Sequence, residues 1–350
     1  MRVVHVINSL ATGGAETVVV DFAIEAARVG DDVTILTLSD DDGIPLRRAK
    51  AAGIRVINLS SSVWNPFIPF RIMANSKNAE IVHAHLFPAF YWVALLPGRR
   101  LVFTEHSTNN RRMSFQWLRP LELLVYSRYS KLIAITDGVG RRLKDHVGPK
   151  LSSRVVVSTN GIRETFFERS SARKSHNSRI VSVGSLKPVK RHALAIQAVA
   201  QLESATLKIA GEGPMRSELT KLIDSLGVSD RIELLGAVDD IPSLLQESDV
   251  LLCCSEFEGF SLAAAEAQAA GLPVVGPAVD GLDEVVVDGM TGFLFEGAEV
   301  SGVVTQLRRA MSEENYPRLS RQAVEHAGHF SIRSSYGRQL EVYEEALKLS

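Results

Sequence analysis

The chain has 350 residues, of which 45% are hydrophobic and 23% are charged, and its formal net charge at pH 7 is −1. This length predicts about two globular domains of ~150 residues each, and either can bury a core without help from disulfides or metals. The longest apolar stretch, residues 87–96, is far shorter than the ~20 residues that cross a bilayer, so no membrane-spanning segment is expected.

The first half alternates short β-branched runs with helical segments. The pattern predicts a parallel sheet with right-handed crossovers. The expected strands are residues 3–10, 31–38, 54–59, 79–86, 100–106, 130–136 and 155–162, and a helix follows the first strand up to about residue 29. Residues 164–178 are polar and rich in Ser and charge, so they are predicted to be a linker.

The second half starts the alternation again. Strands are expected at residues 179–186, 205–213, 231–236, 249–256 and 272–277, and helices at 192–202, 215–227, 241–248 and 261–271. The predicted fold class is therefore α/β, with two tandem Rossmann-like domains that face each other across a cleft, residues 1–165 and 166–331. A final helix, residues 332–350, is expected to pack back on the first domain. Because ligands bind beyond the carboxyl ends of parallel strands, the cleft is the expected active site.

The start of the chain, its cysteines and its charge distribution indicate the cellular compartment and the kind of partner. The start of the chain, MRVVHVINSL, lacks the long apolar region of a secretory signal. Cys253 and Cys254 are adjacent on an expected strand, where they point to opposite faces, so they favour buried free thiols in a reducing compartment. Residues 1–165 hold 21 Lys and Arg against 14 Asp and Glu, and the rest holds 18 against 26. A cytoplasmic protein is expected, and its basic first half suits an anionic acceptor or the inner face of the membrane, although incidental asymmetry is an equal alternative.

The sharpest motif is EFEGFSLAAAEAQAAGLPVVG, residues 256–276. Glu258 lies in a strand-to-helix loop before Gly259, and Glu266 lies on the alanine-rich helix that follows. Such carboxylates can accept hydrogen bonds from a sugar and a ribose; a solvated loop acid and a helix-surface acid are the plain alternatives. The free amides at the helix start, which favour a diphosphate, are those of Phe260, Ser261 and Leu262.

This motif and several others resemble the retaining glycosyltransferases of family four, also called glycosyl transferases group 1, which have the two-Rossmann-domain GT-B architecture. In family order the chain shows TGGAE at 12–16, TEHS at 104–107, TNGI at 159–162, VGSLKPVKRH at 183–192, IAGEGP at 209–214, DGMTGFLF at 288–295 and YEEAL at 343–347. The resemblance implies that Glu258 contacts the donor sugar and Glu266 the nucleotide ribose. It also implies no metal and no cofactor, because the nucleotide sugar is a substrate.

Further residues of the donor site are expected from the chemistry of their side chains and from the resemblance to the family. Lys190, in a strand-to-helix connection, can reach a pyrophosphate as a point charge. The family usually has arginine where Ser185 stands, so Lys187 is expected to supply that charge, against a plain surface lysine. The resemblance implies that Gly211 lies in a donor-side loop, although a strand-ending glycine is the plain alternative, and that the backbone of Val238 approaches the base.

The acceptor side is predicted in the first half. Gly13 and Gly14 precede a helix and let a phosphate or sugar approach the backbone, unless they only form a tight turn with positive φ. By resemblance this loop, with Glu16, faces the acceptor, and Gly14 also faces the donor. His106 matches a histidine that the family places beside the transferred sugar. The expected catalytic residues are Glu258, Lys190 and His106.

Metal and membrane signals are weaker. His83 and His85 share one strand face, but a metal needs a third ligand that the sequence does not announce, and Asp40 and Asp42 are best explained as a solvated turn. No metal and no nucleic-acid partner are expected. Residues 110–131 mix arginines with Phe, Trp and Leu, which favours peripheral membrane contact slightly over a half-buried helix whose arginines reach the surface.

The sequence therefore predicts a retaining, metal-independent hexosyltransferase. It would transfer a sugar from a UDP or GDP donor to a glycan or lipid-linked acceptor, in cell-surface polysaccharide or glycolipid synthesis. Two alternatives stay open. A sugar-nucleotide epimerase shares the architecture but needs no acceptor, and an inactive nucleotide-sugar binding module is favoured only by Ser185.

Overall fold

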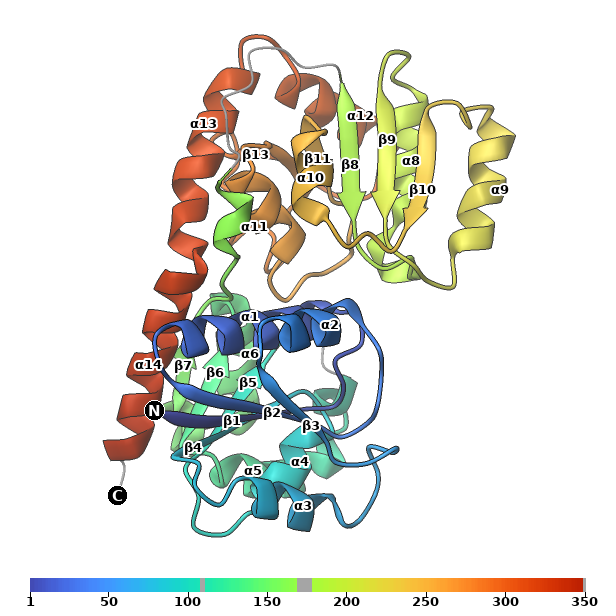
Figure 1. Ribbon diagram of the computed structural model, residues 1–350. Helices are drawn as coiled ribbons and strands as arrows, with labels where there is room; N and C mark the ends of the chain where they lie inside the picture. Colours follow the sequence, from blue (N-terminus) through green and yellow to red (C-terminus); the bar gives the residue numbers. More distant parts are fainter. Residues whose placement is uncertain (108–110, 169–177, 349–350) are drawn as a thin grey trace. The chain divides into compact units, whose positions relative to one another are not determined.

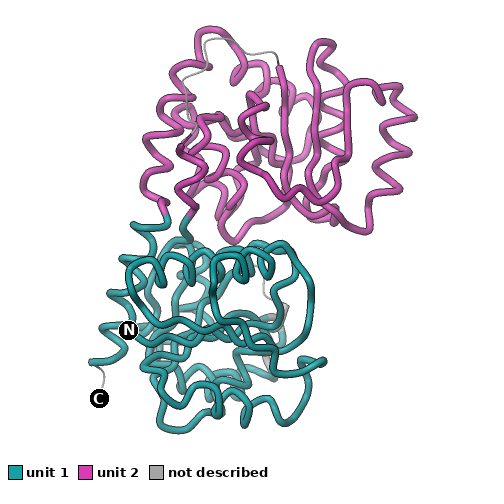
Figure 2. Tube along the Cα trace, in the orientation of Figure 1, with its two compact units in different colours: residues 1–161, 332–350 teal, residues 162–331 magenta. Residues whose placement is uncertain are grey.

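The computed structural model describes residues 1–107, 111–168 and 178–348. The chain forms two compact units, Met1–Gly161 with Ile332–Ser350, and Ile162–Ser331, which Figure 2 shows in different colours. Each unit is a parallel β-sheet covered by helices. The prediction of two Rossmann-like α/β domains is confirmed.

Unit 1 contains a seven-stranded sheet of order β3-β2-β1-β4-β5-β6-β7, and all of its neighbouring strands are parallel. The strands are β1 (Arg2–Ile7), β2 (Asp32–Thr37), β3 (Arg55–Asn58), β4 (Ile81–His85), β5 (Leu101–Glu105), β6 (Lys131–Ala134) and β7 (Val155–Val157). They are rich in Val and Ile because a parallel sheet is buried on both faces.

The helices of unit 1 lie on both faces of this sheet. They are α1 (Gly14–Arg28), α2 (Ile44–Ala51), α3 (Ile68–Asn75), α4 (Ala89–Ala94), α5 (Arg119–Ser127), α6 (Asp137–Val147), α7 (Pro149–Ser152) and α14 (Ile332–Lys348), with 3₁₀ turns η1 (Arg111–Ser114) and η2 (Gln116–Leu118). Figure 1 shows α1 and α2 on one face of the sheet and α3, α4 and α5 on the other.

Helix α14 belongs to unit 1 although it ends the chain. It packs along α1, and the Tyr336 hydroxyl donates to Asp31 at 2.6 Å. Tyr343 is fully buried and its hydroxyl lies 2.7 Å from Nδ1 of His83 in β4. Lys131 in β6 forms an ion pair with Glu345. These contacts make the last helix part of the unit 1 core.

Unit 2 contains a six-stranded parallel sheet of order β10-β9-β8-β11-β12-β13. The strands are β8 (Arg179–Val183), β9 (Thr206–Ala210), β10 (Ile232–Gly236), β11 (Val250–Leu252), β12 (Val274–Pro277) and β13 (Gly292–Phe295). The helices are α8 (His192–Ala200), α9 (Arg216–Leu226), α10 (Ile241–Gln246), α11 (Leu262–Ala269), α12 (Val300–Ala310) and α13 (Tyr316–Ala327), with 3₁₀ turns η3 (Glu164–Phe166), η4 (Pro188–Lys190) and η5 (Gly328–Phe330). Buried side chains of β8, β9, α8 and α12 form much of its core.

The boundary between the units differs from the expected residue 165. Ile162 already belongs to unit 2, because its N–H donates to the Phe330 carbonyl at 2.8 Å and it bridges Ser331. Residues 164–166 of the expected linker form η3, which packs on α11. Residues 169–177 of that linker lie outside the described residues.

Helix properties also bear on membrane insertion. Over the described ranges, no helix combines the length and the apolar character that crossing a bilayer requires.

Candidate active site

The carboxyl ends of β8 and β11 lead into two loops that carry charged side chains. These strands are neighbours, and the chain runs from β8 to β9 on one side and returns through β11 on the other. Ligands of open α/β sheets bind at such a reversal of strand order. Lys190 follows β8 and Glu258 follows β11, and the Lys190 Nζ lies 2.7 Å from the Glu258 Oε1. The two side chains are 25% and 12% exposed, so the pair is partly shielded from water.

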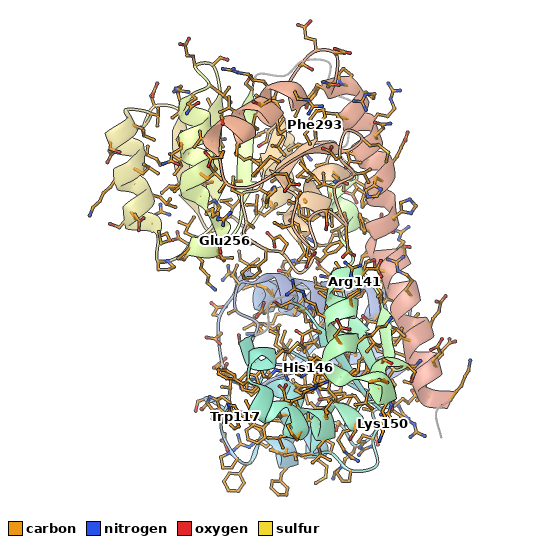
Figure 3. The ribbon with its side chains drawn as sticks, turned by 180° about the vertical axis from the view of Figure 1, so that it is seen from behind. Trp117, Arg141, His146, Lys150, Glu256 and Phe293 are labelled. Carbon is orange, nitrogen blue, oxygen red and sulfur yellow. The ribbon has the colours of Figure 1, made fainter. Side chains whose placement is uncertain are left out.

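A second ion pair holds the same two loops together. Nε of Arg191 donates to Oε1 of Glu256 at 3.0 Å, and the Glu256 amide donates to the Val189 carbonyl at 2.9 Å (Figure 3 labels Glu256). Arg191 adopts a left-handed conformation, with φ 47° and ψ 40°. Strained backbone of this kind persists only where surrounding contacts impose it, and it gathers at functional sites. Sequence reasoning missed Arg191 and Glu256, because only the sheet order brings their loops together.

The start of α11 differs from the expected row of free amides. The Leu262 N–H donates to the Phe260 carbonyl at 2.9 Å, and Ser261 between them has φ −78° and ψ 89°. This is an inverse γ-turn. The prediction of a free Leu262 amide is therefore wrong, because the turn that begins the helix uses it. Glu266 lies half-buried on α11, one turn after the helix begins.

Close backbone packing supports the Glu258 loop. A Cβ on Gly281, whose φ is +82°, would lie 2.6 Å from the Glu258 carbonyl oxygen and 2.7 Å from that of Gly259. The loop after β12 therefore approaches the Glu258–Gly259 backbone as only glycine permits. The Cys253 Sγ lies 3.8 Å from Glu258 Oε1, and burial followed by the Glu258 charge raises the pKa of this thiol. Both cysteines are free, as predicted; Cys254 is buried, but Cys253 is only half-buried.

The other expected donor residues lie on loops at the same end of the sheet. Gly211 directly follows β9, and a Cβ there would lie 1.9 Å from the Gly184 carbonyl oxygen, so glycine is required for the packing of the two loops. Val238 is half-buried in the loop after β10, and Lys187 is exposed in the loop of Lys190. The structure thus gathers these residues on four loops, while the direct contact is between Lys190 and Glu258.

In unit 1 the glycine loop leads directly into a helix. Gly13 is the N-cap of α1 with φ −166° and ψ 165°, and neither Gly13 nor Gly14 has a positive φ. The alternative of a tight turn with positive φ is therefore wrong. A Cβ on Gly13 would lie 2.2 Å from Oε2 of Glu16, so the glycine leaves room for the Glu16 side chain to fold back over the helix start.

His106, which is half-buried, lies at the end of a chain of histidines whose other members are fully buried. Its Nε2 lies 3.1 Å from Nδ1 of His85, and Nε2 of His85 lies 2.9 Å from Nδ1 of His5. Burial lowers the pKa of both His5 and His106 to about 4, and it lowers the pKa of His83 and His85 well below 6.5. All four imidazoles are therefore neutral near pH 7, so each can donate through one nitrogen and accept through the other.

The third ligand that the sequence did not announce stands beside His83 and His85. One ring nitrogen from each of His5, His83 and His85 lies within 4.8 Å of the others. Neutral imidazoles are the form that binds a metal. However, Nδ1 of His83 lies 2.7 Å from the Tyr343 hydroxyl and its Nε2 lies 2.7 Å from Oγ1 of Thr104. Because both His83 nitrogens already have partners, the cluster has the character of a hydrogen-bonded network.

The remaining acidic pair of the first half is exposed. Asp40 and Asp42 follow β2, and Asp42 lies 3.8 Å from Arg47. This placement fits the solvated turn that was expected.

Two family descriptions together match nearly the whole chain. Residues 163–327 match the family described as Glycosyl transferases group 1, and residues 12–166 match Glycosyltransferase Family 4. These two segments correspond closely to the two structural units. The segment that matches Glycosyl transferases group 1 contains the loops of Lys190 and Glu258.

Individual relatives agree with these matches. N-acetyl-alpha-D-glucosaminyl L-malate synthase of Bacillus anthracis is 34% identical over 142 residues, which are 40% of this chain and 37% of that relative. D-inositol 3-phosphate glycosyltransferase of Mycobacterium bovis is 29% identical over 390 aligned positions, which cover 96% of this chain and 79% of that relative. HepE of Anabaena, solved in complex with UDP and glucose, superposes with a TM-score of 0.85 at 20% identity and covers 97% of this chain and 98% of its own. At that identity the likeness shows the fold.

Proposed function

Because the chain belongs to the group 1 glycosyl transferases of the GT-B fold, we propose that it is a retaining hexosyltransferase. Its donor would be a UDP or GDP sugar and its acceptor a glycan or a lipid-linked saccharide. The observation that carries the proposal is the 2.7 Å contact between Lys190 and Glu258 at the point where the strand order of unit 2 reverses. A cation for a diphosphate and a carboxylate for sugar hydroxyls stand there side by side.

The donor half of the proposed site is unit 2. Lys190, aided by Lys187, would bind the diphosphate, Glu258 would accept hydrogen bonds from the sugar, and Glu266 would accept them from the ribose. The backbones of Gly211, Val238 and Gly259–Ser261 would line the nucleotide. HepE, which shares this fold, was solved with UDP and glucose, and this supports a uridine nucleotide.

The acceptor half of the proposed site is unit 1. Gly13, Gly14 and Glu16 at the start of α1 would face the acceptor, and His106 would lie beside the transferred sugar. The buried chain of His5 and His85 supports this role, since it fixes the orientation of the His106 ring. Synthesis of a polysaccharide or a glycolipid at the cytoplasmic face of the membrane is the proposed setting.

The proposed reaction exchanges one bond at the anomeric carbon for another on the same face. The bond from that carbon to the diphosphate oxygen breaks as the bond to the acceptor oxygen forms. The acceptor hydroxyl gives its proton to the departing diphosphate, whose charge Lys190 and Lys187 would stabilise in place of a metal ion. Retention is tested by the anomeric configuration of the product in an NMR spectrum, and metal independence by transfer in excess EDTA.

A panel of nucleotide sugars tests the function. The full chain is incubated with UDP-glucose, UDP-galactose, UDP-N-acetylglucosamine and GDP-mannose, each with and without a lipid extract. Release of nucleotide that depends on the extract supports transfer. An epimerised donor without any acceptor would identify an epimerase instead. Thermal stabilisation by a donor without turnover would identify the binding module that Ser185 favours.

A further inference from the structure

Many large apolar side chains between residues 64 and 124 of unit 1 are exposed to solvent. In the described part of the chain, the large apolar side chains that are at least 60% exposed all come from this stretch. They are Trp64, Phe67, Phe70, Leu95, Trp117 and Leu124, and we call them the apolar face. The stretch also holds all three tryptophans of the protein. Scattered exposed leucines are ordinary, but grouped exposed aromatic rings mark an interaction site.

The apolar face is built on three helices that pack in succession. Helix α3 packs on α4, and α4 packs on α5 (Figure 1). The Trp64 ring lies 5.5 Å from that of Phe87, and Nε1 of Trp92 donates to the Val63 carbonyl at 2.8 Å. Trp117, in η2 directly before α5, projects from the surface of unit 1 in Figure 3. The exposed rings therefore belong to one ordered surface.

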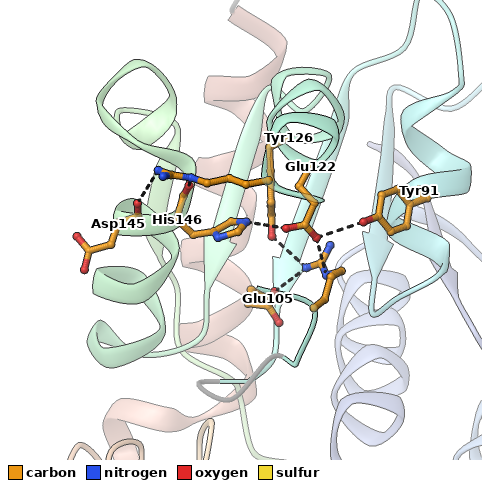
Figure 4. A network of polar contacts seen from close by, with 8 residues as sticks. Tyr91, Glu105, Glu122, Tyr126, Asp145 and His146 are labelled. Atoms are coloured by element: carbon orange, nitrogen blue, oxygen red, sulfur yellow. Dashed lines mark hydrogen bonds and ion pairs between the residues drawn. The ribbon is translucent and has the colours of Figure 1, made fainter. Parts of the chain in front are cut away.

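Helix α5 buries a carboxylate and exposes leucines, the reverse of an ordinary surface helix. Glu122 is fully buried, while Leu121 and Leu124 are 52% and 65% exposed. The Glu122 carboxylate pairs with Nε of Arg112 at 3.1 Å and with Nε2 of His146 at 2.7 Å (Figure 4). A helix facing water normally buries its leucines and exposes its carboxylates. The internal ion pairs therefore hold the leucines outward.

The stretch of chain that carries the apolar face is rich in positive charge. Residues 59–130 contain eight Lys and Arg and three Asp and Glu. Two of the acids, Glu105 and Glu122, are buried and paired with Arg112, which leaves Glu80 as the exposed acid. Arg128 donates to two carbonyls on either side of Leu95, so its charge lies beside the apolar face. It also lines a hollow of about 540 Å³ together with Arg99, Arg100 and Glu80.

We propose that the apolar face docks unit 1 on the surface of an anionic lipid bilayer. Tryptophan and phenylalanine rings sit well at the boundary between headgroups and acyl chains, and arginines beside them attract lipid phosphates. The hollow of Arg99, Arg100 and Arg128 receives the headgroups. The proposal rests on the proposed function for its setting, because a lipid-linked acceptor would be presented at that surface. The sequence had indicated only residues 110–131, whereas the aromatic rings of α3 and its preceding loop supply half of the apolar face; residue 110 lies outside the described residues.

Vesicle flotation of the full chain tests the docking. Vesicles of phosphatidylcholine with phosphatidylglycerol should carry the protein, vesicles of phosphatidylcholine alone should carry much less, and added salt should weaken binding. Tryptophan fluorescence should shift to shorter wavelength on binding, since all three tryptophans lie in this stretch. The triple variant Trp64→Ser, Phe67→Ser, Phe70→Ser should lower partitioning at least ~tenfold. The double variant Arg99→Gln, Arg100→Gln should lose the preference for the anionic vesicles.

A matched control replaces two exposed apolar residues elsewhere, Val29→Ser and Leu226→Ser, and should bind vesicles as the natural chain does. Failure of the protein to bind either vesicle would overturn the proposal. So would binding that the triple variant leaves unchanged, or a concentration-dependent dimer that the triple variant abolishes, because the surface would then join two copies. Thermal stabilisation by UDP is measured on the same variants. It reports on the donor site, so failure of docking and failure of the proposed function are distinguished.

Discussion

The Lys190–Glu258 contact places a cation that could bind a diphosphate beside a carboxylate that could bind sugar hydroxyls. In the absence of a donor each neutralises the other across 2.7 Å. Under the proposed function, the diphosphate of a bound donor would replace Glu258 as the partner of Lys190 and would leave the Glu258 carboxylate available to sugar hydroxyls. Charge-assisted hydrogen bonds of this type contribute ~1.5–3 kcal/mol each. The value of the pair to the proposed reaction therefore lies in exchanging partners when the donor binds.

Removing either charge should slow transfer strongly. We expect Glu258→Gln and Lys190→Met each to lower kcat/KM at least ~tenfold, because one charge-assisted hydrogen bond of ~1.5 kcal/mol or more is lost. The measurement is nucleotide release with the donor that the panel identifies. The exposed pair Lys208 and Glu247, 3.2 Å apart in the same unit, provides matched controls in Lys208→Met and Glu247→Gln. Equal activity of the two sets would remove both residues from the site.

The buried histidines make a prediction about acid stability. In the unfolded chain they bind protons below about pH 6.5, whereas burial lowers the pKa of His5 and His106 to about 4 in the folded chain. Between those values the unfolded state binds more protons, so the free energy of unfolding falls as the pH is lowered and is unaffected by these groups above pH 6.5. Each group contributes at most ~1.4 kcal/mol per pH unit.

The measurement is urea unfolding at a series of pH values between about 7.5 and about 5. This range spans the pKa of a free histidine, ~6.5. The midpoint should fall with pH, and the variant His106→Gln should show a shallower fall because it lacks one of the titrating groups. A midpoint that stays constant across this range would contradict the burial of uncharged histidines.

At the scale of elements, the loops after β8 and β9 show why particular glycines are needed. Gly211 has a φ of +151°, and a Cβ there would lie 1.9 Å from the Gly184 carbonyl oxygen. Gly227 also has a positive φ, +66°, but among the described residues beyond its chain neighbours no atom lies within 4 Å of its hypothetical Cβ. Glycine is therefore needed at position 211 for both the backbone conformation and the close packing, and at position 227 for the conformation alone.

Alanine substitutions should separate these two requirements. Gly227→Ala should cost ~1–2 kcal/mol of unfolding free energy for the left-handed conformation. Gly211→Ala should cost more, by a further ~1–3 kcal/mol, because the loops must move apart. Chemical denaturation measures both, and calorimetry with UDP should show weaker binding only for Gly211→Ala. Equal costs for the two variants would show that the loops after β8 and β9 are not tightly packed.

Strand β13 shows where local sequence signals fail. Its residues GFLF were recognised as a motif but not as a strand, since glycine is depleted in strands and weakens the pattern. In the structure a Cβ on Gly292 would lie 1.9 Å from the Val274 carbonyl oxygen of β12. Close approach of the two strands, which cannot be read from either one alone, demands the glycine.

At the scale of the whole molecule, the chain leaves unit 1 at Gly161 and returns to it at Ile332. Tyr336 and Tyr343 of the returning helix are 2% and 0% exposed. Fully burying a large apolar side chain contributes ~1.5–3 kcal/mol, and the hydroxyl of Tyr343 also satisfies the buried His83. The last helix therefore stabilises the first part of the sequence.

A chain that ends at Ser331 should reveal this dependence. We expect amide hydrogens of β1 to β7 to lose most of their protection against exchange, while those of β8 to β13 keep theirs, because α14 belongs to unit 1 alone. Hydrogen exchange followed by mass spectrometry measures both sheets in one experiment. The single variant Tyr343→Phe serves as a milder control that removes only the hydroxyl. Unchanged protection of unit 1 in the shortened chain would show that α14 is dispensable.

By itself the sequence determined the alternation of strands and helices, the two parallel sheets and the motif around Glu258, because hydrophobic periodicity, chain turns and short motifs are local properties. The tertiary structure alone decided that Arg191 pairs with Glu256, that His5 completes a histidine cluster, and that the apolar face is exposed. Each of these depends on which strands become neighbours and on which side of a helix is buried. Both are set only when distant segments pack against one another, so no single stretch of the sequence can predict them.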